Sequence, residues 1–224
     1  SSWLVTVKIQ VDGVKMFGAG WGVASGTYHH GDLPNALRSA AADLLAEEGV
    51  AGFSLREVAR RAHVSHAAPA HHFGDAAGLL TAVAVEGFDH LTAATAAAVE
   101  GVDDPVDALA AVGRAYVTLS VEHPGHCAVL FRKDALCGDD PAYQAAGHRA
   151  FDVLLGAVER LARERAPELD VLLAAQLCWS TVQGLVDLYP SMVGLSELSG
   201  DPLPEIEAMA ERFTRHLVAG LAPA

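Results

Sequence analysis

The chain has 224 residues, 51% of them apolar, which is enough material for one large domain or two small ones. Its 15 Lys and Arg residues against 28 Asp and Glu residues give a formal net charge of −13, which excludes a uniformly basic nucleic-acid coat. No apolar run reaches the roughly 18 residues of a membrane span and the N-terminus lacks a signal-peptide layout, so we expect a cytoplasmic protein without a membrane partner.

Residues 1–27 differ in pattern from the rest and are interpreted as an N-terminal extension. LVTVKIQV alternates apolar and polar residues, and Asp12-Gly13 is a favoured turn dipeptide, which indicates a hairpin followed by a linker. The glycines of GAGWGVASG (18–26) do not fit a dinucleotide-binding loop, because the third glycine of that motif would fall at Val23.

The apolar spacing turns helical at residue 32 and predicts a first domain over residues 28–90. Its first helix is expected to be capped by Asp32 and ended by Gly49. Its last helix is expected to start near Asp75 and to continue through Phe88.

Two short helices between them carry the most specific local signals. SLRE at 54–57 is a capping box, in which the Ser54 hydroxyl and the Glu57 carboxylate each accept a hydrogen bond from a backbone amide. Ser65 is the expected N-cap of the next helix, which would run to about Phe73 and start about three residues after the previous one ends. Such a pair predicts a helix-turn-helix.

Longer helices predict a second, larger domain over residues 91–224, so the fold class is all-α. They are expected at 103–123, 142–165, 168–189 and 203–221. Pro190 should bend or end the third of them.

A helix-turn-helix reads DNA by placing its second helix in the major groove, while hydroxyl groups and helix N-termini bind phosphates. Ser54 and Ser65 suit phosphate contacts, and small residues at the start of the second helix let the backbone approach the bases. The expected DNA-binding residues are Ser54, Arg56, Ser65, His66, Ala67, Ala68, Ala70 and His71.

Two motifs, ALRSAAADLLAEEGVAGFSLREVARRAHVS (36–65) and HAAPAHHFGDAAGLLTAV (66–83), resemble the N-terminal domain of the tetracycline-repressor (TetR) family of bacterial transcription regulators. CWSTVQGLVDL (178–188) and HPGHCAVLF (123–131) resemble the Trp-His-Gly subclass of its C-terminal domains, with Gln183 where that pattern has histidine.

The resemblance implies an N-terminal DNA-binding domain and a C-terminal helical domain that binds an effector and forms a homodimer. The helices at about 168–189 and 203–221 would pair across the two-fold axis, and a small-molecule effector would release a repressor from its double-stranded DNA operator. Both helices carry more apolar surface than one subunit needs, although internal packing would also explain their stripes.

Three departures from the family pattern predict weak DNA binding. Ala70 stands where the family commonly has tyrosine, and Ala76 where it commonly has lysine; each lost phosphate contact weakens binding and flattens its salt dependence. Pro69 would also forfeit a hydrogen bond of a helix capped by Ser65. The third departure is the acidic balance of the first domain, which leaves the histidines and four arginines to bind phosphates: Arg38, Arg56, Arg60 and Arg61. The alternative function is a helical ligand- or partner-binding dimer with a degenerate DNA-binding head.

The effector pocket is expected among large apolar or aromatic residues of the middle helices. The candidates are Tyr116, His126, Phe131, Phe151, Trp179 and Gln183. Aromatic residues on helical stripes also occur as plain core, and Trp179 also fits a dimer seam. Arg132 and Lys133 would neutralise an anionic effector or simply end a helix in solvent.

No metal site, cofactor or catalytic role is expected. Of the histidines in HVSHAAPAHHF (63–73), His66 and His71 are five residues apart, a spacing at which two ligands do not share a helix face. Cys127 beside His126 is poor support for a nucleophile and base, and the three cysteines have neither metal-like nor disulfide-like spacing.

Overall fold

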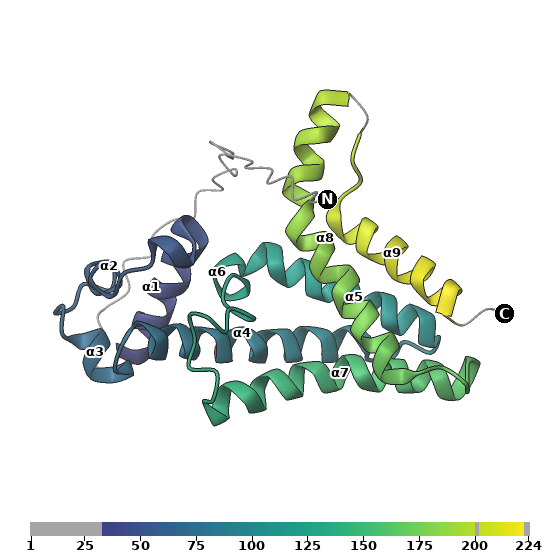
Figure 1. Cartoon of the computed structure of the whole chain (residues 1–224), viewed down its shortest axis with the longest axis horizontal. Helices are drawn as coiled ribbons and strands as arrows, with labels where there is room; N and C mark the ends of the chain where they lie inside the picture. The colour runs from purple at the N-terminus through teal and green to yellow at the C-terminus, as the bar shows by residue number, and fades with distance from the viewer. Residues whose placement is uncertain (1–32, 200–201, 222–224) are drawn as a thin grey trace, which may run out of the picture. The chain divides into compact units, whose positions relative to one another are not determined.

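Helices form all of the regular structure in the computed structural model, which describes residues 33–199 and 202–221 (Figure 1). No strand occurs within those two ranges, and the predicted all-α fold class is confirmed. The expected hairpin and linker of residues 1–27 and the expected Asp32 cap lie outside the described residues.

Three helices and a single 3-10 turn make up residues 33–75, here named the head. They are α1 (Leu33–Glu48), η1 (Val50–Gly52), α2 (Leu55–Arg61) and α3 (Ala68–Phe73). Gly49 has a φ of 65°, a conformation that glycine adopts without steric cost, and it ends α1 as expected. The leucines of α1 are buried together with Val58 of α2 and Leu79 of the following helix, in a cluster that also holds Leu119 and Tyr143, so the packed centre of the head continues into the rest of the protein.

α4 (Ala76–Val99) joins the head to the rest of the protein as one continuous helix of 24 residues. Asp75 caps it, because its side chain accepts a hydrogen bond from the Gly78 amide at 2.9 Å. The helix continues well beyond Phe88 and passes through the expected domain boundary at residue 90. Head and C-terminal region are therefore connected by a stiff element.

The C-terminal region consists of α5 (Pro105–Glu122), α6 (Pro124–Cys127), α7 (Pro141–Arg165), α8 (Val171–Ser199) and α9 (Ile206–Leu221). Asp104 and Asp140 cap α5 and α7 with the prolines that follow them in the first turn, so these starts agree with the sequence pattern. The expected end or bend at Pro190 is wrong as a helix end, because α8 continues to Ser199. Proline removes one intrahelical hydrogen bond, and the remaining turns hold.

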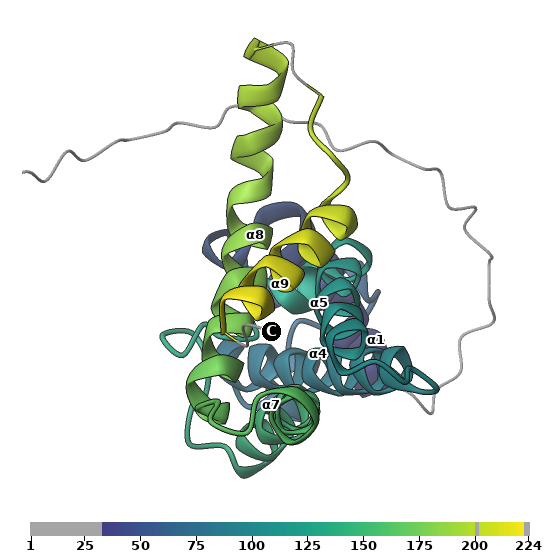
Figure 2. The same cartoon turned by 90° about the vertical axis from the view of Figure 1, so that its right-hand side faces the viewer.

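The packing of the helices determines where the candidate sites lie. α4 lies along α7 and α5, and α8 and α9 lie side by side on α5 (Figures 1 and 2). The short helix α6 packs against α1 of the head as well as against α4. It is thus a second link between the head and the C-terminal region.

Candidate functional site

The start of α2 differs from the predicted capping box. Ser54 occupies the N-cap, but its side chain makes no capping hydrogen bond. Glu57 instead accepts hydrogen bonds from Arg60 Nε at 2.8 Å and from Arg61 Nε at 3.0 Å, and these two guanidinium groups lower the pKa of its carboxyl to about 2. Two charged partners outcompete one backbone amide for the carboxylate.

The recognition helix α3 starts later than predicted. It begins at Ala68 with Ala67 as N-cap and no side-chain cap, so Ser65 is not its cap, and six residues (62–67) separate it from α2 rather than three. The turn is longer because Val64 packs on the core of the head, with its amide bonded to the Ala59 carbonyl at 3.0 Å. Pro69 therefore lies in the first turn, where its missing N–H costs no intrahelical bond.

Most of the predicted DNA-binding side chains are on the surface of the head. Ala68 is half-buried, and the exposed ones are Ser54, Arg56, Ser65, His66, Ala67, Ala70 and His71. DNA contact by these residues stays a prediction. Their shared exposure around α3 leaves the backbone of the recognition helix accessible.

Carboxylates hold most of the positive charge of the head. Arg61 pairs with Glu47 at 2.7 Å and with Glu57, and Arg38 on α1 pairs with Glu86 on α4 at 2.9 Å. Within residues 33–199 and 202–221, Arg56 has no carboxylate partner. The charge freely available for phosphates is therefore small.

A cavity of about 640 Å³ lies between α4, α5, α7 and α8. Aromatic rings form much of its wall: the ring centroids of Phe131 and Trp179 are 4.9 Å apart, and those of Phe88 and Phe131 are 5.6 Å apart. Its volume falls within the range of about 300–1,000 Å³ that small-molecule sites occupy.

Four of the six predicted pocket residues line this cavity, namely Tyr116, Phe131, Phe151 and Trp179. Gln183 is not in the wall, but it accepts a hydrogen bond from the Tyr116 hydroxyl and donates to Asp187 Oδ1 at 3.0 Å. Burial raises the pKa of Tyr116, so its phenol stays a donor. Ligand binding by these residues remains a prediction.

Sequence reasoning missed the α4 side of the cavity and, apart from Phe151, its α7 side. Phe88, Leu91 and Thr95 line it from α4, and Gly147 and His148 line it from α7. The missed signal was the length of α4, which was expected to end near Phe88. Lys133 also lines the cavity and has no carboxylate partner among the described residues, whereas the neighbouring Arg132 is bound by Asp134 at 2.9 Å.

His126, the sixth predicted pocket residue, lies outside the cavity wall and against His90 of α4 and His123 at the α5–α6 turn. The pKa of His126 is lowered to about 4, chiefly by burial; Glu86 opposes this shift, and His90 and His123 add to it. Its imidazole is therefore neutral at pH 7. The search for metal ligands within residues 63–73 missed this group because its members are far apart in sequence.

Two glycines allow α6 to sit close to its neighbours. A Cβ at Gly125 would lie 1.9 Å from the Ala42 carbonyl oxygen of α1, and a Cβ at Gly87 of α4 would lie 2.8 Å from Leu130 Cδ2. The residue after Gly87 is the cavity residue Phe88, and the residue after Leu130 is the cavity residue Phe131. A continuous packed path thus runs from the cavity to the head.

The head has a helix-turn-helix, and one helix and one close glycine contact join it to a helical region with an apolar cavity. This combination defines a ligand-responsive DNA-binding transcription regulator.

The family described as "Bacterial regulatory proteins, tetR family" matches residues 37–83, and "Tetracyclin repressor-like, C-terminal domain" matches residues 109–216. The chain belongs to the TetR family of transcription regulators, which are not enzymes. The Trp-His-Gly subclass remains a prediction. No curated protein sequence matches the chain.

Solved structures share the fold. A protein of unknown function from Rhodococcus sp. RHA1 is 31% identical, with a TM-score of 0.69 over 87% of this chain and 98% of that one. The TetR family regulator PfmR from Thermus thermophilus is 23% identical, with a TM-score of 0.66 over 83% and 98%. FadR from Bacillus subtilis, solved in complex with stearoyl-CoA, is 17% identical, with a TM-score of 0.66 over 83% and 98%.

Proposed function

We propose that this regulator is a cytoplasmic homodimeric repressor, released from its operator when a large apolar effector fills the cavity. The observation that carries the proposal is the packed path from the cavity to the head, through Phe88 and Gly87 of α4 and through α6. A ligand that wedges Phe88 or Phe131 outward must also displace Leu130 and α6, because close-packed interiors transmit displacement.

The effector is proposed to have a long apolar body and one anionic group. Phenylalanine, leucine and tryptophan side chains supply the apolar wall, and Lys133 is the cavity residue with an unpaired positive charge. Fatty acids, and acyl chains joined through a thioester to the phosphate-bearing coenzyme A, have an apolar body with an anionic end. The complex of the structural neighbour FadR with stearoyl-CoA supports that class.

Dimerisation through α8 and α9 is proposed because both helices expose large apolar side chains. The α8 leucines are between 50% and 86% exposed: Leu172, Leu173, Leu188, Leu195 and Leu198. By length and composition α8 is also the one helix of the described residues that would cross a membrane, which is weak support for such a location. A second copy of the same chain buries this face in an isologous contact.

DNA binding is proposed to be weak and to depend on small residues and backbone amides of α3 more than on charge. The intramolecular pairs of Arg38, Arg60 and Arg61 support this, together with alanine at positions 70 and 76. A head that has lost DNA binding altogether is the competing outcome of the test.

The test starts from the full chain, with which duplexes are selected from a random-sequence pool. We expect enrichment of a palindromic site, bound by a dimer in fluorescence anisotropy, and at least about a tenfold loss of affinity when a long-chain acyl-CoA is added. A short-chain acyl-CoA is the matched control, because it carries the same nucleotide as the long-chain ligand but a shorter acyl chain. Failure to enrich any sequence at low salt would refute the repressor function, and enrichment that no acyl-CoA reverses would refute the effector class alone.

A further inference from the structure

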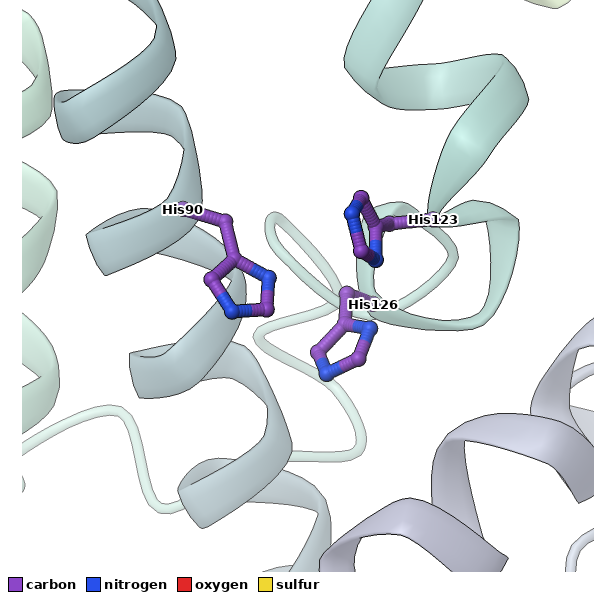
Figure 3. Close-up of side chains that lie close together, drawn as sticks. All are labelled: His90, His123 and His126. Carbon is purple, nitrogen blue, oxygen red and sulfur yellow. The ribbon is translucent and has the colours of Figure 1, made fainter. Parts of the chain in front are cut away.

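We propose that His90, His123 and His126 form a binding site for a divalent transition-metal ion of the Zn²⁺ class, separate from the apolar cavity. The three imidazoles come from three different places in the fold: α4, the α5–α6 turn and α6. Figure 3 shows the rings converging on one space between α4 and the α5–α6 turn.

The spacing of the three rings fits one ion. One ring nitrogen from each histidine lies within 4.8 Å of the others, and the ring centroids of His90 and His123 are also 4.8 Å apart. In a tetrahedral zinc site with Zn–N distances of about 2.0–2.1 Å, the nitrogens are about 3.3 Å apart. The proposal requires rotations of the three side chains to bring the nitrogens closer by up to about 1.5 Å.

His90 gives a second, independent indication of a ligand. Its Nδ1 is buried and has no hydrogen-bond partner, and it is the one such side-chain atom in the part of the chain that the structure describes. Buried polar nitrogens are nearly always satisfied, so an orphan of this kind calls for an ion or a water molecule. A metal ion would satisfy it and would also account for three imidazoles gathered at one place.

Glu86 lies one turn before His90 on α4, beside the proposed metal site. Its Oε2 is 4.0 Å from His126 Nε2 and accepts a hydrogen bond from Arg38 Nε of α1 at 2.9 Å. A carboxylate behind a metal-binding histidine orients the ring and offsets part of the ion's charge. The same carboxylate connects the proposed site to the head.

The donor set selects the class of metal. Imidazole nitrogens suit Zn²⁺, Co²⁺, Ni²⁺ and Cu²⁺, whereas Mg²⁺ and Ca²⁺ require oxygen ligands. Three histidines leave a fourth position for water. The ion would fasten α4 to the α5–α6 turn and so hold α6 in place against α1. Metal binding itself does not depend on the proposed repressor function.

The test uses the full chain without a polyhistidine tag, freed of metal by EDTA dialysis. Zn²⁺ is titrated against a chromophoric chelator, and Co²⁺ is added as a spectroscopic probe. We expect one Zn²⁺ per chain, a tetrahedral Co²⁺ spectrum, and a loss of Zn²⁺ affinity of at least about 100-fold in the double variant His90→Gln/His123→Gln. Glu86→Gln keeps all three imidazoles, although it also removes the ion pair with Arg38, and should lose about 10- to 100-fold.

Two variants keep the result interpretable. His216→Gln on α9 removes a histidine far from the group in sequence and should bind Zn²⁺ like the parent chain. His123→Cys keeps a ligand at the same position and should add a sulfur-to-cobalt charge-transfer band, which a merely misfolded protein would not show. Equal Zn²⁺ affinity in the parent and the double variant, or a stoichiometry near zero in the folded parent, would overturn the proposal.

Discussion

The head and the cavity region use charge in opposite ways. In the head, glutamates hold Arg38, Arg60 and Arg61, so the surface that faces DNA offers exposed small residues and little free positive charge. The cavity has almost no ionic groups, yet its Lys133 has no carboxylate partner among the described residues. Each region therefore keeps one cation without a carboxylate partner among the described residues, Arg56 in the head and Lys133 at the cavity, but only Lys133 lies beside an apolar wall.

The largest effect should come from breaking the contact that joins the two regions. Gly125→Val places a side chain against the Ala42 carbonyl, and backbone cannot yield as a flexible side chain does. We expect a loss of about 3 kcal/mol in the free energy of unfolding, measured by urea titration. Gly138→Val, which meets no atom within 4 Å, is the control and should change stability by less than about 1 kcal/mol.

Filling the cavity should separate effector binding from DNA binding. Gly147→Leu projects into the space beside Phe88, whose ring atoms are 3.6 Å from the new Cβ, and leucine also favours the helix. Affinity for a long-chain acyl-CoA, measured by calorimetry, should fall at least about 100-fold, while operator affinity stays within about twofold. Gly156→Leu, on the exposed side of the same helix, should alter neither. Retained acyl-CoA affinity in Gly147→Leu would mean that the ligand binds elsewhere.

Removing the unpaired charge of the cavity should weaken the binding of anionic effectors only. Lys133→Met keeps the length and apolar character of the side chain, so we expect about a tenfold loss of affinity for a fatty acid and no change for the matching alcohol. Isothermal titration of the two ligands checks this. Arg132→Met is the control, because Arg132 is already paired with Asp134. Equal losses for acid and alcohol would point to packing rather than charge.

Freeing charge in the head should strengthen DNA binding slightly. Glu57→Gln releases Arg60 and removes one of the two carboxylate partners of Arg61. We expect a several-fold gain in operator affinity at low salt, and a dependence of that affinity on salt that is steeper by about one unit of slope. Glu48→Gln makes the same change of net charge at an exposed residue with no recorded ion pair and serves as the control. An identical gain in both variants would show that net charge, and not the released arginine, is responsible.

Some features held by neighbouring residues were predictable from the sequence, although the capping box of Ser54 and Glu57 was wrong. Asp104-Pro105 and Asp140-Pro141 mark helix starts through contacts within one turn, and Gly49 marks a helix end through its own φ. Ser65 failed as a cap because Val64 is drawn into the core of the head, a contact that no local pattern encodes.

The sites show the same limit. Tyr116 and Trp179 were identified by residue type on long helices, whereas the contribution of α4 to the cavity depends on where that helix ends. The group of His90, His123 and His126 depends on the packing of α4 against the α5–α6 turn. Sequence spacing, which predicted no metal site, cannot show that these three histidines lie together.

The unbroken length of α4 has a mechanical consequence. Phe88 lies 12 residues after Ala76, a rise of about 18 Å along the helix, so the helix acts as a lever that moves the head. A tilt of about 6° about the cavity end would sweep the other end through about 2 Å. In a dimer the two levers would move the recognition helices by twice that amount relative to each other, and half-sites at a fixed spacing on the duplex do not tolerate such a change.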